Sequence, residues 1–176
     1  MKRAIALALA LSIVLLLCGC ASNDYKKAVN LYEAGNYEEA KVLFEKNIDY
    51  EDSIEYIKNI EVLLDPVGAI EAECESIIRS DKKLWSAYMS LLDSSVRLGI
   101  ATSGGNFVFE TKYDEQSNDF ACLVDIPYMN GNEVFMHYYF GFAGHLDVPN
   151  VIITNIESIE FTESKVDSFW ARYWNH

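Results

Sequence analysis

The hydrophobic pattern of this chain changes its period once, across residues 99–106. Before that stretch, Ile70, Ile77 and Leu84 are spaced seven residues apart, as on one side of a helix. After it, residues 107–113 alternate in character, as in a strand with one dry and one wet face. Helices that are followed by strands predict an α+β fold with a small antiparallel sheet.

The helical half is predicted to contain two parts. Residues Tyr25 to Asp65 have a helical pattern that breaks at Gly35-Asn36, so a helical hairpin is expected around the break. A new helix is expected to start at Pro66, because proline suits the first turn of a helix. Residues 66–98 then form either two helices or one kinked helix. Asp81 caps the second helix in the first case and interrupts the apolar stripe in the other.

The second half is predicted to form an antiparallel sheet over residues 107–162 and a C-terminal helix over 164–174. Asn130-Gly131 between two apolar runs is a strong signal for a hairpin turn. The expected strands, in chain order, are Phe107–Tyr113, Phe120–Tyr128, Val134–Phe142, Val151–Thr154 and Ser158–Phe161. The second and third are apolar on both faces, which predicts helices on both sides of the sheet. The alternative is an aromatic stacking surface for a sugar or a peptide.

Composition limits the possible partners. Apolar residues make up 51% of the chain, which is too much for a disordered tail. Twenty-seven Asp and Glu against 14 Lys and Arg give a net charge of −13. A chain with this balance cannot neutralise a run of phosphates, so no nucleic-acid partner is expected.

The first 19 residues have the organisation of an export signal. Lys2 and Arg3 precede an apolar run from Ala4 to Leu17, and small residues follow. At ~1.5 Å per residue the run is shorter than the ~30 Å hydrocarbon core of a bilayer. Cleavage is therefore favoured over an uncleaved membrane anchor.

The end of this leader, Leu17-Cys18-Gly19-Cys20, resembles the lipobox of bacterial lipoproteins. The resemblance implies that Cys20 receives a diacylglycerol thioether and becomes the first residue of the mature chain. It also implies a location on the extracytoplasmic face of the cell membrane, with the membrane as a partner through the lipid anchor.

Residues 22–52 resemble a tetratricopeptide repeat. Five residues fall at the spacing of the family's helix-packing positions: Ala28, Gly35, Tyr37, Ala40 and Phe44. Asn47 and Asp52 depart from the pattern, and no second full copy follows. In the family's geometry Gly35 occupies a tight turn that is expected to leave no room for a side chain. Such units usually bind partners.

No residue is predicted to be catalytic, and neither a metal nor a cofactor is expected. A two-residue turn at Asn130-Gly131 would set His137 opposite Val124 and leave Asp125 on the other face, so no His–Asp dyad is expected. His145 and Asp147 fall in an expected loop, Gly141 to Asp147, and two ligands in a loop are a weak metal signal.

Cys74 and Cys122 are the cysteines that remain after the leader and the lipidated position. Two readings stay open. They are separate buried thiols that behave as small hydrophobes, or they pair in a disulfide outside the cytoplasm.

Together these features predict a signal peptide (1–19), a tetratricopeptide-like region (20–65) and an α+β domain (66–176). The expected function is a non-enzymatic, lipid-anchored binding or scaffold protein of the bacterial cell envelope, with an unknown protein or cell-wall partner. The alternatives are a small envelope hydrolase and a solute-binding lipoprotein. A deep cavity lined by Tyr128 and Tyr139 would indicate solute capture.

Overall fold

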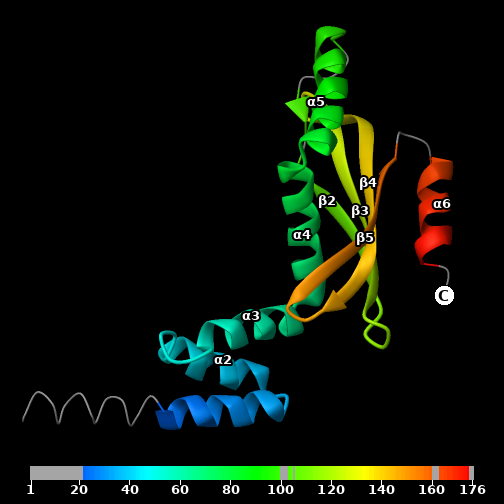
Figure 1. The fold of residues 1–176 in the computed structure, drawn as a ribbon. Coiled ribbons are helices and arrows are strands. Elements are labelled where there is room, and N and C mark those ends of the chain that lie inside the picture. Colours follow the sequence, from blue (N-terminus) through cyan, green and yellow to red (C-terminus); the bar gives the residue numbers. More distant parts are fainter. Residues whose placement is uncertain (1–21, 100–102, 105, 160–162, 175–176) are drawn as a thin grey trace, which may run out of the picture. The chain divides into compact units, whose positions relative to one another are not determined.

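The structure is a computed structural model that describes residues 22–99, 103–104, 106–159 and 163–174. The chain divides into two compact units, Met1–Leu64 and Asp65–His176. Helices precede an antiparallel sheet and a last helix follows it, which confirms the predicted α+β class (Figure 1). Cys20 and the leader lie outside the described residues.

The first unit is helical. Residues 22–33 are helical, and α2 (Tyr37–Lys46) and α3 (Ser53–Leu64) follow. Its core combines small, aliphatic and aromatic side chains, and the rings of Phe44 and Tyr56 stack with their centroids 4.6 Å apart. The fully buried members of this core are Ala28, Ala40, Phe44 and Ile60.

Gly35 ends the first helix with a left-handed turn. Its N–H donates to the Tyr32 carbonyl at 3.0 Å, and the Asn36 N–H donates to the Leu31 carbonyl at 2.8 Å. This pair of bonds is the Schellman arrangement, which places a residue with positive φ after the helix. Gly35 has φ +77°, and a Cβ built there would meet nothing within 4 Å. The expectation that the turn lacks room is therefore wrong, because the glycine is needed for its backbone angle.

The second unit begins with two helices, α4 (Pro66–Ser80) and α5 (Lys82–Arg97). The Asp81 carboxylate between them accepts hydrogen bonds from the N–H groups of Lys83 and Leu84, at 2.8 and 3.0 Å. This cap satisfies two of the free donors at the start of α5. Of the two readings of residues 66–98, the structure confirms two helices with Asp81 as the cap.

The sheet is antiparallel throughout its described pairings, in the order β1-β3-β4-β5, with β2 also paired to β3. The strands are β1 (Ser103–Gly104), β2 (Val108–Tyr113), β3 (Asp119–Asn130), β4 (Glu133–Asp147) and β5 (Asn150–Ile159). The two long central strands β3 and β4 carry the others at their edges.

Strand β4 extends through the segment that was expected to be a loop, Gly141 to Asp147. The two glycines of this segment allow close approach of neighbouring groups. A Cβ on Gly141 would lie 2.5 Å from the Phe169 ring, and one on Gly144 would lie 2.0 Å from the Ile152 carbonyl oxygen. A strand glycine commonly marks such contacts or a bulge, and the β4–β5 register shifts between Ala143 and Gly144.

Helices cover both faces of the sheet, as predicted. Helices α4 and α5 lie on one face, and α6 (Glu163–Tyr173) lies on the other (Figure 1). On β3, Cys122, Val124 and Tyr128 belong to the core beneath α4 and α5. Ala121 and Leu123 point the other way and pack with Phe169 of α6. Tyr128 and Phe140 are thus core residues, which argues against the aromatic stacking surface.

Candidate functional site

Asp125 and His137 form a close polar pair on neighbouring strands. The Asp125 Oδ2 atom lies 2.6 Å from His137 Nδ1. The prediction that these residues lie on opposite faces is wrong, because the register differs from the expected one. The hairpin turn is Gly131-Asn132, since Asn130 pairs with Glu133.

A β-bulge, which shifts the β3–β4 register between Tyr128 and Met129, accounts for the rest of the difference from the expected register. Beyond it His137 lies opposite Pro127 rather than Val124. Without the bulge the hairpin would place His137 opposite Ile126, on the face beneath α4 and α5. One inserted residue therefore moves the imidazole to the face that carries Asp125.

The environment of the pair is half-buried. The side chains of His137 and Asp125 are 37% and 18% exposed. Burial raises the pKa of Asp125, and the hydrogen bond and charge of His137 oppose that increase. The second carboxylate oxygen, Oδ1, is buried and accepts no hydrogen bond from the described residues. The His137 ring also stacks on Tyr139, with centroids 5.8 Å apart and an 8° interplanar angle.

An aspartate bound to one ring nitrogen fixes the tautomer and orientation of a histidine, which is how general bases are held in many hydrolases. His137 and Asp125 have this arrangement. His145 and Asp147 do not share it: both lie exposed on β4, where His145 pairs with Asp119 and Ile152. Within the described ranges, no group of three or more His, Cys, Asp and Glu side chains is placed to hold a metal ion.

The cavity that would indicate solute capture is not formed by its two expected residues. Tyr128 is fully buried beneath α5 and donates its hydroxyl to the Tyr88 carbonyl oxygen at 3.2 Å. Tyr139 lies on the opposite face, packed with the α6 cluster. A single cavity cannot be lined by both side chains.

The surface of the helical hairpin has two open hollows. One, of about 270 Å³, is lined by residues from the turn and from the ends of the helices: Gly35, Asn36, Tyr37, Glu38, Glu39 and Leu64. The other, of about 220 Å³, is lined by residues on the first helix and α2: Lys27, Leu31, Glu39, Val42 and Leu43. Glu39 lines both, so the hollows adjoin along α2.

The residues of the tetratricopeptide-like pattern lie together in this unit. Ala28, Ala40 and Phe44 are fully buried in its core, and Tyr37 packs at its edge. The Tyr37 ring contacts Tyr32 with centroids 5.5 Å apart. Gly35 and Tyr37 of this pattern also line the first hollow, so the hollows lie directly beside the residues that hold the helices together.

Cys74 on α4 and Cys122 on β3 are free thiols in the structure. Both are fully buried, and both belong to the same core. This agrees with the reading of buried thiols that behave as small hydrophobes, and the disulfide stays a prediction.

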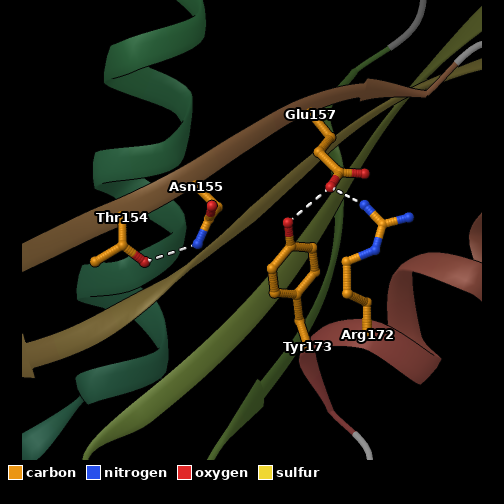
Figure 2. Close-up of polar contacts among 5 residues, drawn as sticks. All are labelled: Thr154, Asn155, Glu157, Arg172 and Tyr173. Atoms are coloured by element: carbon orange, nitrogen blue, oxygen red, sulfur yellow. Dashed lines mark hydrogen bonds and ion pairs between the residues drawn. The ribbon is translucent and has the colours of Figure 1, made fainter.

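Polar contacts also hold α6 against the sheet, and the sequence pattern did not indicate them. Glu157 on β5 accepts a hydrogen bond from the Tyr173 hydroxyl at 2.7 Å and pairs with the Arg172 guanidinium (Figure 2). Lys112 of β2 places its Nζ 4.1 Å from the centre of the Trp170 ring. These contacts fix α6 at two strands beside its apolar packing.

Comparisons with protein-family models, curated proteins and solved structures found no match to this chain. Among the described residues, no helix has both the length and the apolar character that crossing a bilayer requires.

Proposed function

We propose that this protein is a lipid-anchored binding or scaffold protein on the extracytoplasmic face of the bacterial cell membrane. The observation that carries the proposal is the leader, in which a charged start and an apolar run end at Leu17-Cys18-Gly19-Cys20. Acylation at Cys20 supplies the anchor, since each buried methylene is worth ~0.8 kcal/mol and two chains hold firmly. The acidic body is repelled by anionic headgroups, so the lipid alone keeps it at the membrane.

The hairpin surface supports a binding role for the first unit. Its hollows, of about 270 and 220 Å³, are open and smaller than most pockets that enclose a small molecule. They suit side chains of a protein or peptide that lies across α2. The first hollow carries Glu38 and Glu39 and no basic residue, so it suits a basic side chain. In the second, Lys27 stands beside Glu39 and the apolar Leu31 and Val42, so it suits an apolar side chain.

The anchor is tested by replacing Cys20 with Ser and following palmitate incorporation and membrane fractionation. Labelling is expected to disappear and the chain to leave the membrane fraction. Cys18→Ser is the matched control, because serine also suits that position and Cys20 remains. Continued labelling of Cys20→Ser would contradict the lipobox.

The binding surface is tested at Val42, which is 51% exposed in the hollow on α2. Val42→Glu is expected to abolish cross-linking between the anchored protein and its partner without changing thermal unfolding. Ile54→Glu is the matched control, because Ile54 is 52% exposed on α3 and lines neither hollow. Equal loss in both variants would contradict a binding role for the hollows.

The second candidate function, a small envelope hydrolase, is favoured by one observation, the Asp125–His137 contact. This pair would act as the oriented general base in place of His145. Hydrolysis of ester or amide probes that vanishes in both His137→Gln and Asp125→Asn would support it. Activity that survives in either variant would count against it.

A further inference from the structure

Cys74 and Cys122 face one another from two elements that are far apart in the sequence. Cys74 lies on α4 and Cys122 on β3, and neither is exposed to solvent. Both belong to the same buried core between α4 and the sheet.

A polar contact beside the thiols fixes the face that α4 presents to the sheet. The Thr111 hydroxyl of β2 lies 2.9 Å from Glu71 Oε1 on α4 and 3.3 Å from Cys122 Sγ. Thr111 is the residue that pairs with Cys122 across the β2–β3 ladder. Glu71 precedes Cys74 by about one helical turn, so the same face of α4 carries both residues.

The thiols differ in acidity because of these contacts. The hydrogen bond between them raises the pKa of Cys74, and burial adds to that increase. The same bond lowers the pKa of Cys122 against the opposing effect of burial, and the bond from Thr111 lowers it further. Because both thiols are fully buried in the folded chain, their reaction with an external disulfide has to take place while the chain is folding.

We propose that Cys74 and Cys122 form a disulfide that fastens α4 to β3 when the chain folds in an oxidising compartment. Its formation in the native protein rests on the extracytoplasmic location proposed above. The bond closes a loop of about 50 residues, a length at which a crosslink strongly restricts the unfolded chain.

The oxidant is an external disulfide, such as oxidised glutathione or a disulfide-bearing oxidoreductase. In the folding chain, the thiolate of one cysteine attacks one sulfur of that disulfide and releases one thiolate of the oxidant. The thiolate of the other cysteine then attacks the mixed disulfide, which forms the Cys74–Cys122 bond and releases the second thiolate. Two electrons pass to the oxidant, and its thiolates take up the two cysteine protons.

The full chain, purified in detergent, tests the proposal without reference to its location. After reduction and unfolding, it is refolded with either oxidised or reduced glutathione and then treated with a maleimide in denaturant. Peptide mass spectrometry is expected to show linked Cys74 and Cys122 after oxidative refolding and two maleimide adducts after reductive refolding. The oxidised form is expected to unfold about 10 °C higher.

Cys74→Ser is the matched control. It is expected to give no linked peptide: Cys122 carries glutathione after oxidative refolding and maleimide after reductive refolding. The variant is also expected to gain no thermal stability from oxidative refolding. Maleimide on both cysteines of the wild-type chain, after oxidative refolding that restores cooperative unfolding, would overturn the proposal.

The same readout on cells separates this inference from the proposed function. Cells that produce the chain with its leader are quenched in acid, and palmitate labelling and thiol state are measured together. Labelled protein with the linked peptide supports both. Labelled protein with two free thiols overturns the disulfide and leaves the anchor standing. Unlabelled, reduced protein overturns the location and the native bond together, even where the bond forms on refolding.

Discussion

Asp125 and His137 lie 2.6 Å apart because a bulge in strand β4, between Val134 and Met136, turns the histidine onto the face of the aspartate. The contact joins a carboxyl whose pKa is raised by burial to an imidazole that is still partly open to solvent. A half-buried carboxylate is tolerated there because its partner offsets part of the desolvation.

Replacing Asp125 with Asn is expected to change the pH dependence of stability. A carboxyl whose pKa is raised on folding stabilises the protein fully below its unfolded pKa, and that contribution is lost as pH rises through the folded pKa. The free energy of unfolding of wild type, relative to Asp125→Asn, should therefore fall from about pH 4 upward. Urea unfolding across that range measures it. Asp119→Asn, at an exposed strand position, controls for the loss of one charge. A difference in the free energy of unfolding that grows in favour of wild type with rising pH would contradict the raised pKa of Asp125.

Replacing His137 with Gln is expected to raise the pKa of Asp125 further. Both influences that lower that pKa come from His137, whereas burial remains. Carboxyl-carbon chemical shifts of Asp125, followed by NMR across a pH titration, measure the change. An unchanged titration would show that the two side chains do not interact in solution.

Substitutions at Gly35 are expected to follow backbone conformation rather than size. With φ +77° and free space around a built Cβ, Gly35→Ala should destabilise the first unit by about 1 to 2 kcal/mol. Gly35→Asn should cost less, because asparagine adopts this conformation more readily. Chemical denaturation of the full chain measures both. Equal losses for the two variants would point to crowding instead.

Gly141→Ala is expected to destabilise the contact between β4 and α6. The added methyl would lie 2.5 Å from the Phe169 ring, so the helix must move, at a cost of about 1 to 3 kcal/mol. The matched background is Phe169→Ala, in which the obstacle is gone and the second substitution should cost little more. Thermal unfolding of the four chains tests this. Additive losses would show that the collision is not the cause.

Asp81→Ala should weaken the junction between α4 and α5 by about 1 kcal/mol, because two N–H groups of the first turn lose their acceptor. Asp93→Ala is the control, since Asp93 is exposed on the same helix without a capping role. Circular dichroism during thermal unfolding compares them. A larger loss in the control would contradict the capping role.

The sequence pattern was sufficient for helices, then a sheet, then a helix, and for the burial of both sheet faces. It wrongly divided one strand, β5 (Asn150–Ile159), into Val151–Thr154 and Ser158–Phe161. Apolar side chains on β3 alternate between two helix-covered faces, so Leu123 and Val124 are both buried. That outcome depends on composition and period, which are local properties of the chain.

The geometry of the candidate site depends on features that the period of the hydrophobic pattern does not indicate. The bulge opposite Tyr128 and Met129 has no composition signal, yet it decides which residues meet His137. Gly141 and Gly144 fell in an expected loop, and a glycine needed for close packing looks the same in sequence as one needed for a turn. The burial of Cys74 and Cys122 in one core depends on how α4 docks on the sheet, which spacing alone does not determine.

The register shift between Ala143 and Gly144 has a consequence for how this protein resists aggregation. In the described part of the sheet, β5 pairs with β4 alone, so its other side offers backbone groups to any passing extended chain. The shift interrupts the even row of such groups, and Glu157 adds a charge held by α6. Neighbouring protein chains would thus find a poor template for strand-to-strand aggregation along β5.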